Sequence, residues 1–271
     1  MRLPALICLL LTLGAPPATA GEKSLWDIAA RLHAKQFVDL THAFSPSSPH
    51  GAGLPAESTL TLYHYDPGVG TLGAGGLIYQ YTLPGQWGTH VDAPNHFHRT
   101  GRSLDRIPPK QMLLPLVVID VHQQAARNPD YTLRMADIRA WEKKHGAVPR
   151  GAFVAMRTDW SKRWPDAAKL FNRDDKGVGH YPGWSLETLK YLYEERGITA
   201  SGHETSDTDR GIDASRFKFD LEAYVLAHAA YQIELMTNLD QLPEQGALII
   251  ATWPKPEGGS GFPARVFAIL P

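Results

Sequence analysis

The chain has 271 residues, with 27 Lys and Arg against 28 Asp and Glu, and 43% of its residues are hydrophobic. This near-neutral balance excludes a basic nucleic-acid-binding protein and a highly charged disordered chain, and the length suits one large domain or two small ones. The single cysteine, Cys8, excludes an internal disulfide framework and a cysteine-based metal site, whereas the 12 histidines leave open a metal centre of nitrogen and oxygen ligands.

The N-terminal 20 residues have the pattern of a secretory signal peptide. Arg2 supplies the basic start, an apolar run continues to Leu13, and the small residues 18–20 (ATA) match a cleavage site. The apolar run is shorter than the roughly 18 residues that a membrane-spanning helix needs. We therefore predict a signal peptide at 1–20 and an exported, periplasmic or secreted, cysteine-free domain at 21–271.

Helical and extended patterns alternate along the rest of the chain without a strict strand–helix–strand rhythm. Apolar residues at helical spacing behind the N-caps Ser24, Thr132 and Ser185 predict helices at 24–35, 132–145 and 185–197. Alternating or continuous apolar runs predict strands at 36–44, 60–66, 76–84, 113–122, 151–159, 198–204, 246–254 and 264–270. The runs at 113–122 and 151–159 are typical of strands buried on both faces. We expect one mixed α/β domain.

Residues 86–98, QWGTHVDAPNHFH, concentrate potential metal ligands and bases. In an extended segment His90 and Asp92 point to the same face, and Pro94 can turn the chain so that His96 returns towards that face. A His and an Asp two residues apart suit a divalent cation. Loop histidines also cluster by chance, but the arrangement Gly-Thr-His-x-Asp-x-Pro-x-His is more specific than a pair.

This motif resembles the signature of the metal-dependent cyclase family, His-x-Gly-Thr-His-x-Asp-x-Pro-x-His, which includes bacterial kynurenine formamidases and isatin hydrolases. The match runs from Gly88 to His96, and Gln86 stands where the family has its first His. Residues 39–49, 232–246 and the closing RVFAILP also resemble family segments. The resemblance implies a single compact mixed-sheet domain of swivelling β/β/α-like type, usually assembled as a homodimer.

The resemblance also implies a metal site that includes His90, Asp92 and Glu234. Kynurenine formamidase-like members hold two zinc ions, but here two of their histidine positions are Gln86 and Glu222. This favours one ion, as in isatin hydrolase members that use Mn²⁺, with Zn²⁺ as the alternative. Gln232 lies on the same strand face as Glu234, so either residue, or Gln86, could complete the site.

We assign His96 the role of acid–base catalyst, because a neutral imidazole can take a proton from water and return it to a leaving nitrogen. The expected reaction is hydrolysis of a cyclic amide, isatin to isatinate. Trp87, Phe97 and Trp184, together with Tyr181, are candidate contacts for a flat aromatic substrate, although most aromatic residues simply pack in cores.

A second polar patch, GHETSDTDRG at 202–211, follows a predicted strand. Active sites of α/β sheets favour strand ends, so we expect one or two of its residues, His203 and Glu204 among them, to orient the ligands from behind. An acidic surface loop is the alternative interpretation.

Two other functions stay open at this point. An arylformamidase that hydrolyses N-formylkynurenine would need two zinc ions, and Gln86 disfavours it. A non-catalytic periplasmic protein that binds a metal or an aromatic ligand would have no need of His96 as a free base. In each case we expect a small-molecule partner, with no nucleic acid and no membrane.

Overall fold

The computed structural model describes residues 24–51 and 53–271. The predicted signal peptide, 1–20, lies outside the described residues, and its cleavage stays a prediction. The chain divides into two units, of which one ends at Lys35 and contains helix α1 (Leu25–His33), and the other is Gln36–Pro271. Helix α1 begins as predicted, since the Ser24 hydroxyl accepts from the Asp27 amide and the Asp27 carboxylate accepts from the Ser24 amide.

The second unit is a mixed α/β domain, which confirms the predicted fold class. Its strands are β1 (Phe37–Asp39), β2 (Ser58–His64), β3 (Gly73–Ala74), β4 (Ile78–Thr82), β5 (His90–Asp92), β6 (Leu113–Asp120), β7 (Phe153–Arg157), β8 (Ala200–His203), β9 (Tyr231–Glu234), β10 (Leu248–Thr252), β11 (Gly261–Pro263) and β12 (Arg265–Ile269). Its helices are α2 (His122–Arg127), α3 (Met135–His145), α4 (Ala167–Phe171), α5 (Leu186–Lys190), α6 (Gly211–Ala214) and α7 (Asp220–Ala227). No described helix has both the length and the apolar character needed to cross a bilayer.

Nine strands form one mixed sheet in the order β1-β12-β10-β6-β7-β8-β9-β5-β11. Strands β6 to β9 run parallel, and the pairs on either side of them are antiparallel. Strands β11 and β12 lie near opposite ends of this order, yet only Ala264 separates them in the sequence. The sheet must therefore curl until its two ends approach each other.

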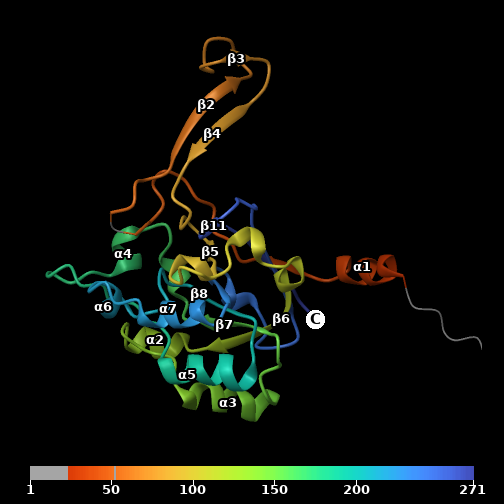
Figure 1. Ribbon diagram of the computed structural model, residues 1–271, viewed down its shortest axis with the longest axis vertical. Helices are drawn as coiled ribbons and strands as arrows, with labels where there is room; N and C mark the ends of the chain where they lie inside the picture. Colours follow the sequence, from red (N-terminus) through yellow and green to blue (C-terminus); the bar gives the residue numbers. More distant parts are fainter. Residues whose placement is uncertain (1–23, 52) are drawn as a thin grey trace, which may run out of the picture. The chain divides into compact units, whose positions relative to one another are not determined.

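The two faces of the central strands pack in separate cores. Val118 and Phe153 point into the core enclosed by the curled sheet, where they meet Val91, Ile233 and Ile249. The alternate residues of the same strands, among them Val117 and Val154, pack under the helices with side chains such as Trp141 and Leu189. Helices α3 and α5 cover this outer face (Figure 1). The prediction that these strands are buried on both faces is confirmed.

The helix predicted at 132–145 starts three residues later than expected. Thr132 forms a bridge with Gly183 and the Leu133 amide donates to the Gly183 carbonyl, so this stretch is extended. Helix α3 begins only after Arg134, whose amide donates to the Asp137 carboxylate at 2.8 Å. The prediction of Thr132 as N-cap was wrong because pairing with a distant segment outweighed the local capping preference.

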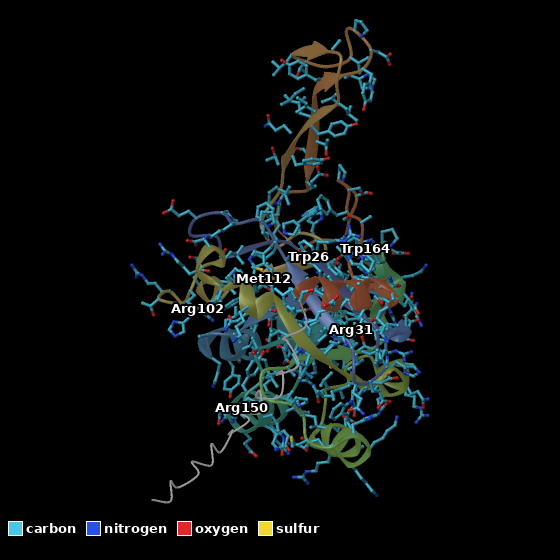
Figure 2. All side chains as sticks on the ribbon, turned by 90° about the vertical axis from the view of Figure 1, so that its right-hand side faces the viewer. Trp26, Arg31, Arg102, Met112, Arg150 and Trp164 are labelled. Carbon is cyan, nitrogen blue, oxygen red and sulfur yellow. The ribbon has the colours of Figure 1, made fainter. Side chains whose placement is uncertain are left out.

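Strands β2, β3 and β4 form a separate three-stranded sheet in the order β3-β2-β4. The predicted strands at 60–66 and 76–84 are both found here. In two perpendicular views this sheet stands away from the nine-stranded sheet (Figures 1 and 2). Residues 83–85 join the end of β4 to the motif at 86–98.

Candidate metal centre

Two antiparallel strands bring the predicted ligands together. Strand β5 pairs with β9 in the register His90 to Glu234, Val91 to Ile233 and Asp92 to Gln232. Since side chains alternate across a strand, Val91 and Ile233 enter the core, and His90, Asp92, Gln232 and Glu234 share the other face. The strand register therefore places residues from segments 140 positions apart on one polar surface.

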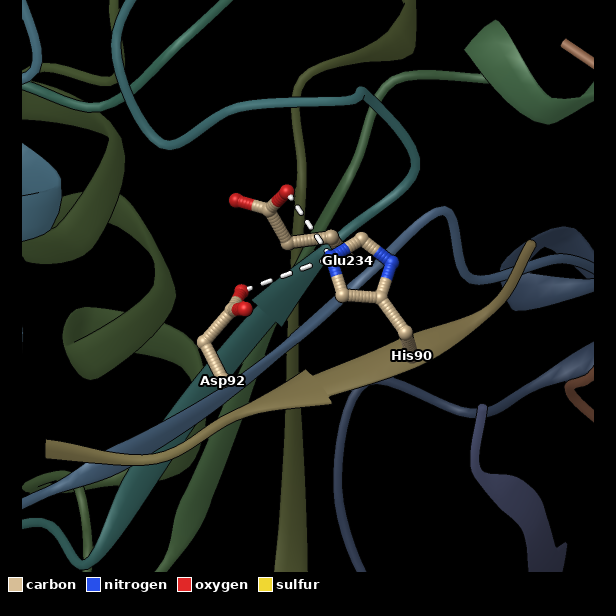
Figure 3. Close-up of side chains that lie close together, drawn as sticks. All are labelled: His90, Asp92 and Glu234. Carbon is tan, nitrogen blue, oxygen red and sulfur yellow. Dashed lines mark ion pairs between the residues drawn. The ribbon is translucent and has the colours of Figure 1, made fainter. Parts of the chain in front are cut away.

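The imidazole of His90 lies between two carboxylates. Its Nε2 atom is 3.5 Å from Asp92 Oδ2 and 3.5 Å from Glu234 Oε2 (Figure 3). One ligand atom from each of the three residues lies within 4.8 Å of the other two, and all three side chains are buried. The structure thus brings together the three residues that were predicted as metal ligands.

The backbone before β5 sets the orientation of His90. Gly88 adopts a φ of +60°, and its carbonyl accepts from His90 Nδ1 at 2.8 Å. A side chain at position 88 would be strained in this conformation and would crowd Phe44. With Nδ1 donating to a backbone carbonyl, the lone pair of Nε2 faces the two carboxylates, as a metal-binding histidine requires.

Two glutamines hold the carboxylates in place. Gln232 Nε2 donates to Asp92 Oδ2 at 3.2 Å and to Glu234 Oε1 at 2.9 Å, while its Oε1 accepts from the Thr208 hydroxyl. Gln86 Nε2 donates to the other oxygen of Asp92 at 3.2 Å. The amide oxygen of Gln232 is thus occupied by Thr208, which favours Glu234 as the third ligand.

The negative charge of the buried carboxylates in this cluster favours the binding of a cation. Burial, together with the nearby Glu222 and Asp92 carboxylates, raises the pKa of Glu234 well above its ordinary value. Burial and Asp92 raise the pKa of Glu222 in the same way. Crowding buried carboxylates around one imidazole is costly unless a positive charge offsets them, and a His/carboxylate set suits Mn²⁺ or Zn²⁺. The donor set therefore fits a divalent metal.

His96 lies beside this cluster at the end of the 3-10 turn Pro94–His96. Its Nε2 is 3.7 Å from Glu222 Oε1, and its Nδ1 is 3.5 Å from Gln86 Nε2. Asp92, His96 and Glu222 also form a second group whose ligand atoms lie within 4.8 Å of one another. In this position His96 can act as a base at the edge of the site formed by His90, Asp92 and Glu234. If the second group held a metal ion, His96 would instead be a ligand of that ion.

A cavity of about 380 Å³ opens over these residues. His90, Asp92, His96, Glu222 and Glu234 form its polar floor. Its walls are largely aromatic and come from segments distant in sequence, namely Phe97, Phe171, Tyr181, Phe217 and Phe219. A small flat ligand with one polar edge would fit this combination of walls and floor.

The structure separates the three aromatic residues that were predicted to touch substrate. Phe97 lines the cavity and packs edge-on against His96, with ring centroids 4.7 Å apart. Trp87 is completely buried and stacks on His50, which itself lines the cavity. Trp184 is also completely buried, and its Nε1 donates to His203 Nδ1 at 3.1 Å. Trp184 therefore lies behind the site and does not line the cavity.

The patch at 202–211 contributes to the site mainly from behind. His203 Nε2 lies 3.3 Å from Glu234 Oε1, and burial together with His90 lowers the pKa of His203 to about 3, so the imidazole is neutral. Asp207 lines the cavity, where it accepts from the Tyr181 and Ser206 hydroxyls. Asp209 accepts from the Leu221 and Glu222 amides at the start of α7 and so positions Glu222.

Glu204 is fully engaged away from the predicted ligands. Its carboxylate accepts from the Thr158 amide at 2.6 Å, from the Thr158 hydroxyl at 3.0 Å and from the Ser161 hydroxyl at 2.6 Å. These bonds fasten the end of β7 to the end of β8. The partner of His90 Nδ1 is the Gly88 carbonyl, so no carboxylate of this patch orients His90.

We expect Glu204→Ala to destabilise the domain by about 2–4 kcal/mol, because it leaves the buried Thr158 amide and two hydroxyls without an acceptor. Chemical denaturation measures this change. Glu187→Ala on the exposed face of α5 is the matched control and should change stability by less than about 0.5 kcal/mol. Equal stability of the two variants would refute the structural role of Glu204.

Several residues of the site carry no recognisable local signal. No motif marks Phe171 at the end of α4, or Phe217 and Phe219 between α6 and α7, and only the folded chain brings them to the cavity. Asp207 lies in a patch that the sequence did mark as polar. Glu222 stands out only through its position in the family pattern.

Comparisons with known proteins agree with this geometry. The family model described as "Putative cyclase" matches residues 38–210. An isatin hydrolase from Roseibium aggregatum is 36% identical over 191 residues, which cover 68% of this chain and 71% of that protein.

Solved structures of isatin hydrolases are also similar to this chain. Isatin hydrolase A from Labrenzia aggregata, bound to benzyl benzoate, has a TM-score of 0.82 at 33% identity and covers 92% of this chain and 99% of its own. Isatin hydrolase A from Ralstonia solanacearum has a TM-score of 0.82 at 35% identity, with 94% and 100% covered.

Proposed function

The chain belongs to the cyclase family, and on that premise we propose that it is a metal-dependent hydrolase that opens the cyclic amide isatin to isatinate. One observation carries the proposal: His90, Asp92 and Glu234 converge in a buried, aromatic-walled cavity with His96 beside them. The identity shared with isatin hydrolases extends over most of the chain and supports the choice of substrate.

His90, Asp92 and Glu234 would hold one divalent cation, which lowers the pKa of a water molecule and polarises a carbonyl when bound. His96 takes a proton as water adds to the amide carbonyl carbon. It returns that proton to the nitrogen as the carbon–nitrogen bond breaks, so that an aromatic amine and a carboxylic acid are formed, and the acid ionises to the carboxylate by releasing its proton to water. Gln86 and Gln232 keep Asp92 and Glu234 oriented throughout.

The walls of the cavity select a flat aromatic substrate. Phe97, beside His96, and Phe171 and Phe219 present apolar surface, while the polar groups gather on the floor. A fused ring held against these walls would direct its amide towards the ligands. Trp87 and Trp184 would act indirectly, through His50 and His203 respectively.

Loss of isatin absorbance by the purified chain, supplied with Mn²⁺ or Zn²⁺, tests the proposal. We expect turnover of isatin and little turnover of N-formylkynurenine. The reverse pattern would identify an arylformamidase. Metal binding without turnover of either compound would identify a non-catalytic binding protein.

Chelation should abolish activity, because the carboxylates of the floor repel the carbonyl oxygen once no cation offsets their charge. We expect EDTA followed by dialysis to reduce the isatin rate by at least about 10³-fold. Added Mn²⁺ should restore the rate at least as well as Zn²⁺, since a mixed His/carboxylate set suits it. Full activity in metal-free protein, checked by elemental analysis, would contradict the proposed mechanism.

We also propose that the enzyme is exported after cleavage near Ala20 and works as a homodimer. The basic, apolar and small-residue segments of 1–20 support export. The homodimer rests on the family resemblance. N-terminal sequencing of protein recovered from the periplasm tests the cleavage site.

A further inference from the structure

Asp207 is a carboxylate of the cavity that the proposed mechanism does not use. It follows β8, is partly buried and lines the cavity. Its Oδ2 atom accepts from the Tyr181 hydroxyl and from the Ser206 hydroxyl, the latter at 2.6 Å. Among residues 24–51 and 53–271, no donor lies within hydrogen-bonding distance of its other oxygen, Oδ1. One oxygen of this carboxylate can therefore accept from a ligand.

Asp207 lies where the aromatic wall of the cavity meets its polar floor. Tyr181, which donates to it, belongs to the wall. The charges of His90 and Asp92 both affect the pKa of Asp207, so its carboxylate is close to the proposed metal ligands. Burial raises the pKa of Asp207 above its ordinary value. A hydrogen-bond donor at Oδ1 would stabilise the charged form of such a carboxylate.

The other carboxylates of the cavity already have a part in the proposed mechanism. Asp92 and Glu234 are the proposed metal ligands, and glutamine amides donate to both of them. Glu222 has an oxygen 3.7 Å from Nε2 of His96, the proposed base. Asp207 belongs to neither candidate ligand group. It is therefore the carboxylate that is left to contact the substrate.

A cyclic amide presents its two polar groups on a single edge. Closure of a small ring holds the amide in the cis form, so the N–H and the C=O point to the same side. An open-chain secondary amide strongly prefers the trans form, in which these groups point to opposite sides. A cyclic amide whose carbonyl faces His90, Asp92 and Glu234 can therefore direct its N–H to a neighbouring carboxylate on the same side.

We propose that Asp207 Oδ1 accepts the ring N–H of the substrate, so that the enzyme selects cyclic amides whose nitrogen carries no substituent. Tyr181 and Ser206 hold the carboxylate in place through Oδ2. As the nitrogen takes the proton that His96 returns, it becomes more positive and its hydrogen bond to Asp207 strengthens. This inference rests on the proposed function and specifies the substrate class of the same site.

N-methylisatin tests the proposal on the wild-type enzyme, because it keeps both carbonyls of isatin and lacks the N–H. Loss of a hydrogen bond to a charged group should lower kcat/KM for N-methylisatin by about 10–100-fold relative to isatin. Each value is first divided by the rate at which hydroxide alone hydrolyses the same compound, which removes the difference in intrinsic reactivity.

Asp207→Asn separates the lost hydrogen bond from a steric effect of the methyl group. The new amide oxygen would accept from Tyr181 and Ser206, so the amide NH₂ would face the substrate N–H. We expect kcat/KM for isatin to fall by about 10–100-fold and that for N-methylisatin to change little, so that the preference disappears. Asp240→Asn is the matched control and should keep the preference, since Asp240 pairs with Lys162 and does not line the cavity.

Two results would overturn the proposal. Equal normalised kcat/KM for the two compounds in the wild type is one, and this comparison stands even if Asp207→Asn misfolds. The other is an Asp207→Asn enzyme that hydrolyses both compounds more slowly by the same factor, as a purely structural role would predict. If the wild type hydrolyses neither compound, the proposed function fails separately. Calorimetric dissociation constants of the wild type then test this inference, which expects isatin to bind at least about 10-fold more tightly than N-methylisatin.

Discussion

Asp92→Ala should abolish both metal binding and hydrolysis. The Asp92 carboxylate lies 3.5 Å from His90 Nε2, belongs to both candidate ligand groups and accepts from Gln86 and Gln232. Removing it deletes a ligand and leaves two amide donors without an acceptor. We expect kcat/KM for isatin to fall by at least about 10³-fold, which corresponds to about 4 kcal/mol of transition-state stabilisation.

Metal content and isatin kinetics measured on the same preparation check this prediction. Asp39→Asn is the matched control, because its side chain is about half-exposed on β1 and pairs with Arg265, and neither residue lines the cavity. That variant should keep its metal and its rate. An Asp92→Ala protein with a full complement of metal and normal turnover would place the metal centre elsewhere.

His96→Gln should separate catalysis from metal binding. His96 lies beside the three proposed ligands, and glutamine fills similar space but cannot take up a proton. We expect kcat to fall by about 10²–10⁴-fold, the usual contribution of a general acid–base group, with nearly unchanged KM and metal content. Steady-state kinetics and elemental analysis provide the two values.

His98→Gln is the control for this variant, since His98 is exposed two residues further on and should not affect kcat. Loss of metal from His96→Gln would show that His96 is a ligand. The group Asp92, His96 and Glu222 would then be the second half of a two-metal site.

The site residues that could be predicted from the sequence are those that lie close together in the chain. His90 and Asp92 alternate on one short strand, and Pro94 begins the turn that carries His96, so spacing alone indicated a common face. Glu234 came from the family resemblance, because its pairing opposite His90 depends on the register of two distant strands.

Residues whose role depends on long-range packing escaped prediction. Trp184 was predicted as a substrate contact, but its indole is completely buried and donates to His203. Phe171 at the end of α4 and Phe217 in the loop before α7 reach the cavity by a course that no local pattern specifies. The same limit explains the misplaced start of α3, where pairing of Thr132 with Gly183 prevailed over the capping signal.

For the fold, the hydrophobic pattern of the sequence predicted the burial of individual strands better than it predicted which sheet each strand joins. Continuous apolar runs marked β6 and β7 as buried on both faces, and the separate cores on their two sides confirm this. Two strands of the three-stranded sheet, β2 and β4, were also predicted, whereas β3 was not. The separation of these strands into a second sheet was not predicted, because an exposed strand can have the same apolar pattern as a strand in a core.

The number of metal ions per subunit in active protein tests the central claim most directly. We predict one ion, held by His90, Asp92 and Glu234 and leaving His96 free as a base. Elemental analysis of protein reconstituted with Mn²⁺ and freed of excess metal by gel filtration gives this number, and the isatin rate of the same sample shows that the counted metal is functional. Two ions per subunit at full activity would contradict the account, because Glu222 and His96 would then be ligands and a different group would have to move the proton.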